Sequence, residues 1–181
     1  MGTLGRRLLL LAIIIALLIY LLPRAGRILY PFTYKENIVE YARVENLDPL
    51  LIAAITRVES KFYPLAESDQ GARGLMQLMP ETAEFAADRL EIPFDPDRLF
   101  IPEYNLRLGS WYIARLIDEF GELIPALAAY NGGRSHVHKW LDRGTWDGQT
   151  LEQIPFPETR EFVRKVLINY RIYHLLYPDV S

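Results

Sequence analysis

Residues 48–60 read DPLLIAAITRVES, a pattern that predicts an apolar helix with a carboxylate near its end. Asp48 is a favourable N-cap and Pro49 suits the first helical position, so the helix is expected to run from Pro49 to about Glu59. Because residues four apart share a helix face, Glu59 lies beneath Ile55, at the edge of the apolar side. A carboxyl group placed there loses hydration, and its raised pKa suits a general acid. Taken alone, a solvent-exposed glutamate at a helix end is the simpler interpretation.

The stretch that follows, residues 68–80, reads SDQGARGLMQLMP and predicts a glycine-punctuated loop. Gly71 and Gly74 indicate backbone positions with a positive φ or a close approach to a ligand, and Gln77 adds a side-chain amide. A Gly-x-x-Gly pair also occurs in loops that clamp nucleic acids, but those loops need basic surroundings that this chain lacks. The two methionines of the stretch are typical of core packing. This loop supplies the groups that could complete a site around Glu59.

The rest of the folded part is predicted to be helical, because no alternating strand pattern of useful length appears in it. Pro102 and Gly121 mark the start and the end of the longest internal helix. A short helix that stops at Asn131 brings Tyr130 to a helix end, where side chains can face a cleft. The expected helices cover residues 33–46, 49–59, 80–90, 102–120, 123–130, 135–141 and 158–174. The soluble part is therefore expected to be all-α.

Composition and missing motifs exclude several classes of function. Lys and Arg number 20 against 23 Asp and Glu, so the net charge of −3 argues against a nucleic-acid partner. The absence of cysteine excludes disulfides, thiolate nucleophiles and Cys-ligated metals. His136 and His138 do not share a helix face and His174 is remote in sequence, so no metal site is expected. The chain also lacks a P-loop, a dinucleotide fingerprint and a serine-hydrolase elbow, and no cofactor is expected.

The N-terminus carries a separate apolar segment. Leu8 to Leu22 is an unbroken apolar run that follows Arg6 and Arg7, whose side chains can reach the membrane interface. Its length lies between those of a signal-peptide core and a spanning helix. No clear small-x-small cleavage site follows, which favours an uncleaved anchor, with a cleaved signal as the alternative. Residues 1–30 are thus the anchor or signal segment, and residues 31–181 the folded domain.

Five motifs, taken in order, resemble the catalytic domain of family 1 soluble lytic transglycosylases. They are Glu59-Ser60, residues 68–80, Asn105-x-x-x-Gly109-x-x-Tyr112, residues 128–133 and residues 154–160. The resemblance covers roughly Tyr41 to Tyr173. It implies a goose-type lysozyme-like fold and an enzyme that cuts peptidoglycan between N-acetylmuramic acid and N-acetylglucosamine. In this family the glutamate first protonates the glycosidic oxygen and then acts as base on the C6 hydroxyl, which gives a 1,6-anhydro end without water.

The resemblance also implies roles for individual residues. Glu59 is the catalytic residue, and the predicted substrate-binding residues are Ser68, Met76, Gln77, Tyr112, Tyr130, Asn131 and Glu158. Tyr130 is expected to hydrogen-bond near Glu59, while Tyr112 and Glu158 are candidates for contacts across the cleft. The sequence departs from the family at Phe162, where Tyr is common, so sugar affinity or cleavage mode can differ.

The expected setting is the bacterial inner membrane, with a single-pass N-terminal anchor and the catalytic domain in the periplasm or cell-wall space. The expected partners are peptidoglycan strands, the membrane through the N-terminal helix, and proteins of the cell-wall machinery. Two other functions stay open. A hydrolytic lysozyme needs a second carboxylate, such as Asp69 or Glu158, to position water. A non-catalytic glycan-binding component of a wall-spanning machine needs no working acid.

Overall fold

The computed structural model describes residues 3–180, and the chain divides into two units, Met1–Thr33 and Tyr34–Ser181. The first unit is one helix, α1 (Thr3–Leu29). This helix continues through Pro23, where the apolar run ends in sequence. Its segment Leu10–Leu29 is long and apolar enough to cross a membrane, a test that signal sequences also pass. The side chain of Arg6 is outside the described part of the structure, so its predicted position at the membrane interface stays a prediction.

The second unit is a bundle of helices joined by short turns. Its elements are α2 (Lys35–Val44), α3 (Pro49–Ser60), α4 (Pro80–Arg89), the 3₁₀ turn η1 (Pro96–Phe100), α5 (Pro102–Phe120), α6 (Leu123–Gly132), α7 (Arg134–Asp142), the 3₁₀ turn η2 (Leu151–Gln153) and α8 (Pro157–Leu176). Within residues 3–180 the only β-type pairings are isolated bridges that join Arg73 to Glu67 and to Leu78. The predicted all-α fold is confirmed.

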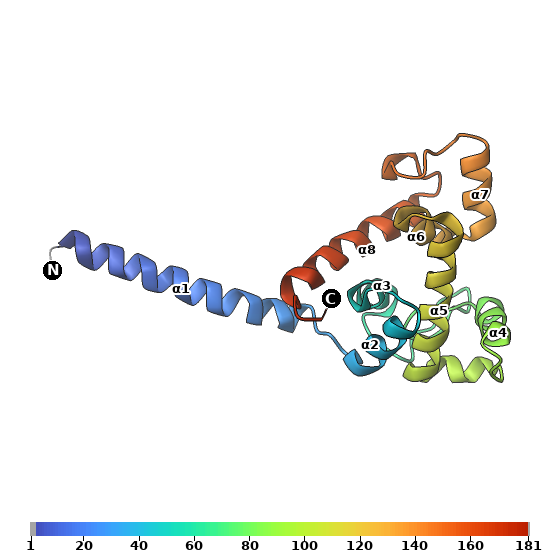
Figure 1. Ribbon diagram of the computed structural model, residues 1–181, viewed down its shortest axis with the longest axis horizontal. Helices are drawn as coiled ribbons and strands as arrows, with labels where there is room; N and C mark the ends of the chain where they lie inside the picture. The colour runs from blue at the N-terminus through green and yellow to red at the C-terminus, as the bar shows by residue number, and fades with distance from the viewer. Residues whose placement is uncertain (1–2, 181) are drawn as a thin grey trace. The chain divides into compact units, whose positions relative to one another are not determined.

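Helix α3 is the central element of this unit and packs against both α2 and α8 (Figure 1). Its apolar residues are almost completely buried, which fixes the helix along its length. Asp48 caps its start by accepting a hydrogen bond from the Leu50 amide at 2.8 Å. The same carboxylate accepts the Tyr170 hydroxyl hydrogen at 2.7 Å, so α8 is tied to the start of α3. Glu59 is thereby held at the opposite end of a rigid helix.

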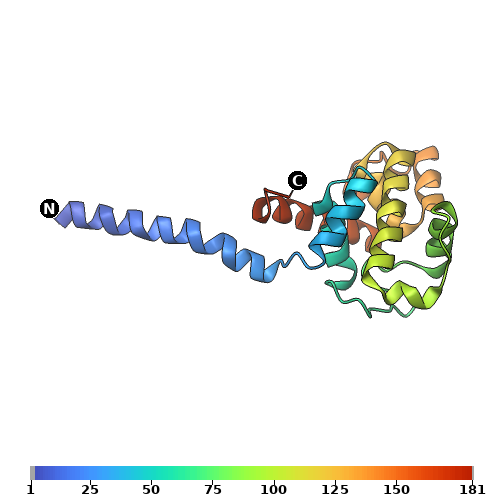
Figure 2. The same cartoon turned by 60° about the horizontal axis from the view of Figure 1, so that its bottom comes forward.

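The remaining helices complete the unit. Helix α5 lies beside α2, as Figure 2 shows, and it also packs against α4 and α6. Helix α6 in turn contacts α7 and α8. This arrangement places the end of α6, which carries Tyr130 and Asn131, near the start of α8, which carries Glu158.

Candidate active site

A cavity of about 400 Å³ lies at the C-terminal end of α3. It combines a carboxyl from α3, polar groups from the loop before α4, the end of α6 and the start of α8. Its wall is formed by Glu59, Ser68, Gln70, Ala72, Gln77, Met79, Tyr130, Asn131 and Glu158. The structure thus brings together six of the predicted site residues, from parts of the chain about a hundred residues apart.

Glu59 is mostly withdrawn from solvent. Its carboxyl group has no hydrogen-bond or ion-pair partner within residues 3–180. Burial, and in second place the negative charge of nearby Glu158, raise the pKa of Glu59 from its ordinary 4.5 to about 8. At neutral pH the group therefore holds its proton and can donate it to a bound ligand. The simpler interpretation of the sequence, in which Glu59 is a solvent-exposed residue at a helix end, is therefore wrong.

Three helices clamp the loop that faces Glu59. The Ser60 hydroxyl, from α3, donates to the carbonyl oxygen of Leu75 at 2.7 Å. The Asn105 Oδ1, from α5, accepts the amide hydrogen of Met76 at 2.8 Å. The Tyr130 hydroxyl, from α6, donates to the Met76 carbonyl oxygen at 2.7 Å. Successive backbone polar groups are thus fixed from three sides, and the residue that follows them is Gln77.

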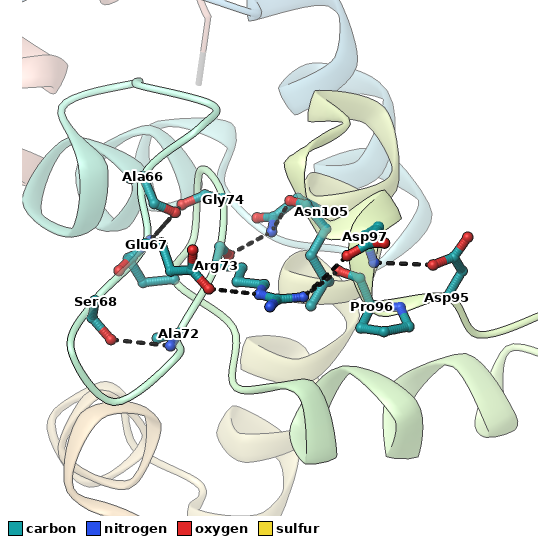
Figure 3. A network of polar contacts seen from close by, with 12 residues as sticks. Ala66, Glu67, Ser68, Ala72, Arg73, Gly74, Asp95, Pro96, Asp97 and Asn105 are labelled. Carbon is teal, nitrogen blue, oxygen red and sulfur yellow. Dashed lines mark hydrogen bonds and ion pairs between the residues drawn. The ribbon is translucent and has the colours of Figure 1, made fainter.

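Asn105 holds a second part of the same loop. This residue is fully buried, and its Nδ2 donates to the Arg73 carbonyl oxygen at 2.9 Å (Figure 3). The same Nδ2 donates to the Leu99 carbonyl oxygen, also at 2.9 Å. The backbone approaches closely here, since a Cβ at Gly74 would lie 2.0 Å from the Leu99 carbonyl oxygen. Gly74 has a φ of 76° and Gly71 a φ of 86°, so the positive φ predicted for both is confirmed. Only glycine fits at position 74.

The side-chain amide of Gln77 has a defined orientation. Its Nε2 donates to the carbonyl oxygens of Ala66 and Gly74, both at 3.0 Å. Both amide hydrogens are therefore used within the loop, and Oε1 is left as an acceptor for a ligand hydroxyl or amide. Ser68 lies across the turn, where its hydroxyl oxygen accepts the Ala72 amide hydrogen at 3.0 Å, also drawn in Figure 3. That hydroxyl still has its own hydrogen to donate.

Two predicted substrate-binding residues lie behind the cavity instead of on its wall. The Met76 side chain is fully buried, against Gly109 of α5, because the clamp on its backbone turns it into the core. The Tyr112 ring packs 5.7 Å from the Tyr130 ring, between centroids, and supports it. The methionine on the wall is Met79, whose side chain is 41% exposed. In the sequence both methionines of this loop are typical of core packing, and no local signal distinguishes Met79.

Phe162 stands where the sequence resemblance implies a Tyr. Its ring stacks on that of Tyr130, with centroids 6.2 Å apart and an interplanar angle of 5°. Only 6% of the residue is exposed, although it borders a smaller cavity that also contains Glu59. Its structural role is thus to hold the Tyr130 ring, and the hydrocarbon edge performs this without a hydroxyl group.

Comparison with known proteins identifies the family. Residues 36–151 match the model of the transglycosylase SLT domain, which is more than half of the chain. The chain belongs to this family. The matched segment ends before α8, so Glu158 and Phe162 lie beyond it.

Relatives and solved structures support the same membership. The soluble lytic murein transglycosylase of Salmonella typhimurium is 38% identical over 144 residues, which is 76% of this chain and 22% of the relative. The 70 kDa soluble lytic transglycosylase of Escherichia coli superposes with a TM-score of 0.78 at 31% identity, over 86% of this chain and 26% of that one. An inactive mutant of the Pseudomonas aeruginosa lytic transglycosylase Slt gives a TM-score of 0.77 at 35% identity, with coverage of 86% and 26%. The chain spans about a quarter of the length of these relatives.

Proposed function

We propose that this protein is a peptidoglycan lytic transglycosylase in which Glu59 is the general acid. The observation that carries the proposal is a lone, mostly buried carboxyl in a polar cavity, with a pKa raised to about 8. A protonated carboxyl at neutral pH can transfer its hydrogen to a glycosidic oxygen as the bond to C1 breaks. The names of the similar proteins support murein as the substrate.

The second half of the reaction uses the same residue as a base. Once Glu59 has given up its proton, its carboxylate can accept the hydrogen of the C6 hydroxyl of the muramic acid. That oxygen then attacks C1 of the same sugar and closes a 1,6-anhydro ring, so no water is consumed. An intramolecular nucleophile can reach a very large effective molarity, which offsets the lack of a second carboxylate that activates water.

The remaining groups on the cavity wall would bind the glycan. Ser68 offers a donor and Gln77 an acceptor, while Asn131 and Glu158 also border the cavity. Tyr130 lies beside Glu59, and we assign Met76 and Tyr112 the task of holding it in place. Uncharged hydrogen-bonding groups suit hydroxyl and acetamido substituents, which carry no charge.

A hydrolytic muramidase is the second candidate, because Glu158 borders the same cavity as Glu59. A carboxylate in that position could hold and activate a water molecule. Asp69 is a weaker candidate for that role, since it is exposed and does not border the cavity.

We also propose that α1 anchors the protein in the bacterial inner membrane, with residues 31–181 in the periplasm or cell-wall space. The length and composition of Leu10–Leu29 support this placement. N-terminal sequencing of the mature protein after an alkaline wash of membranes tests it. An intact N-terminus in the washed membrane is expected, and a soluble protein that begins after α1 would indicate a cleaved signal.

Digestion of purified peptidoglycan sacculi by the full chain tests the enzymatic proposal. Wild-type protein is expected to release soluble muropeptides, and Glu59→Gln to lose at least about a hundredfold of that rate while still binding sacculi. Full lytic activity in Glu59→Gln would exclude the proposed acid. Binding without any release by the wild-type protein would favour a non-catalytic glycan-binding function.

A further inference from the structure

Two smaller cavities, called arms below, share the wall residues Asn131 and Glu158 with the cavity beside Glu59. One arm, of about 250 Å³, returns past Glu59 toward Glu161 and Lys165 of α8. The other arm, of about 390 Å³, does not include Glu59 in its wall and is bordered by Gly132, Phe156, Pro157 and Thr159. The second arm is called the aromatic arm below. The proposed reaction assigns no role to it.

Phe156 is the main apolar surface of the aromatic arm, and it is held rigidly. Its ring meets the Trp140 ring edge to face at a centroid distance of 4.8 Å and the His136 ring at 5.0 Å. Trp140 is itself 8% exposed and packs against the buried Trp146. Even so, 39% of Phe156 is exposed. A large aromatic ring fixed by two others, yet open to a cavity, is prepared for contact with a ligand.

The two arms differ in charge. The arm toward α8 contains Glu161 and Lys165, and the Glu161 Oε1 lies 3.7 Å from the Lys165 Nζ. The aromatic arm has only Glu158, at its mouth, as a charged neighbour. A pyranose ring is uncharged and presents a face of C–H groups, and the negative face of an aromatic ring attracts such weakly positive edges. A neutral sugar therefore fits the aromatic arm better than the charged one.

From these features we infer that the aromatic arm binds one further sugar ring of the glycan strand, stacked on Phe156. The inference rests on the proposed function. It adds a sugar-binding subsite, so the protein should bind longer glycan strands more tightly than short ones. Asn131 and Glu158, which border both this arm and the cavity beside Glu59, would then contact the strand on its way from Glu59 to Phe156.

Binding measured by calorimetry on the full chain in detergent tests this inference. In a Glu59→Gln background, which prevents turnover, the probes are an N-acetylglucosamine trisaccharide and a hexasaccharide. Phe156→Leu removes the flat ring but keeps an apolar side chain. We expect it to reduce the affinity for the hexasaccharide relative to the trisaccharide by about two- to tenfold. Phe156→Tyr keeps the ring and should keep the preference.

Phe85 provides a matched control. It is also 39% exposed and packs edge to face on a tryptophan, Trp111, at 5.8 Å, but it borders none of the three cavities. Phe85→Leu should leave both affinities unchanged.

Equal loss for both sugars in Phe156→Leu, or no loss, would overturn the inference. Cleavage of sacculi by the wild-type protein is measured in parallel. If cleavage persists and the length preference is absent, the subsite alone is refuted, whereas the absence of both cleavage and sugar binding refutes the proposed function.

Discussion

The hydroxyl group of Tyr130 donates a hydrogen bond to the main-chain carbonyl of Met76 at 2.7 Å, and so joins the end of α6 to the loop that faces Glu59. Burial, with a further contribution from the charge of Glu59, raises the pKa of Tyr130 well above its usual value of 10.0. The hydroxyl therefore stays a neutral donor across the range in which Glu59 titrates. The Tyr130 hydroxyl can therefore donate to the Met76 carbonyl oxygen whether Glu59 is protonated or charged.

Tyr130→Phe is expected to lower both stability and activity. The variant leaves the Met76 carbonyl without its donor, while the ring can still stack on Phe162. An acceptor that loses its partner in this setting costs about 1 to 3 kcal/mol, measurable by urea denaturation. The rate of muropeptide release should fall about tenfold, because the loop with Gln77 loses one of its three clamps. Unchanged release from a fully folded variant would contradict a positioning role for this bond.

Alanine substitution of two glycines should separate backbone strain from steric conflict. Gly71 and Gly74 both have a positive φ, so alanine is strained by about 1 to 2 kcal/mol at either position. A Cβ at Gly71 meets nothing within 4 Å, whereas at Gly74 it meets the Leu99 carbonyl oxygen at 2.0 Å and the Asn105 amide. We therefore expect Gly74→Ala to lose about 2 kcal/mol more than Gly71→Ala. Equal losses in urea unfolding would mean that the loop relaxes freely.

The pH dependence of cleavage should follow the protonation of Glu59. Because a general acid must carry its proton, kcat/KM is expected to fall as pH rises through about 8. The charge of Glu158 contributes to that value, so Glu158→Gln should shift the falling limb to lower pH. Glu161→Gln is the control, since the raised pKa of Glu59 arises from burial and from the charge of Glu158. A limb that stays in place in Glu158→Gln would exclude the proposed coupling.

The same raised pKa makes the stability of the protein depend on pH. Between pH 4.5 and about 8 the folded state keeps a proton on Glu59 that the unfolded state releases. This contribution is fully present below pH 4.5 and is lost as pH rises to about 8. Glu59→Gln has no group that titrates here and so does not lose this stability. The difference in free energy of unfolding, variant minus wild type, should therefore grow as pH rises across this window, by a few kcal/mol at most. A constant difference from pH 4 to pH 9 would show that the carboxyl is well hydrated.

Helix bounds could be predicted wherever a residue with a strict backbone preference marks them. Pro49, Pro80 and Pro102 each begin a helix in the structure, and Gly121 ends α5 with a φ of 72°. Proline at a first turn and glycine in the left-handed region are local effects that need no tertiary information. The order of the helices, and so the all-α class, followed from these signals.

Tertiary contacts determined the parts that could not be predicted. No periodic pattern tells which way Met76 faces, because the direction of its side chain depends on the bond from its amide to Asn105, 29 residues away. The 3₁₀ turns η1 and η2 lie in stretches rich in proline and aspartate that read as loops. The aromatic arm depends on Trp140 of α7 and Phe156, whose rings meet across 16 residues of sequence. Residues separated in this way give no local signal.

Product analysis in water enriched in ¹⁸O tests most directly whether Glu59 acts alone as acid and then as base. Sacculi are digested by the full chain, and the new muramic acid ends are examined by mass spectrometry. Cleavage by attack of the C6 hydroxyl predicts 1,6-anhydro ends without ¹⁸O. Reducing ends that carry ¹⁸O would contradict it, and would indicate that water attacks C1 in a hydrolytic reaction.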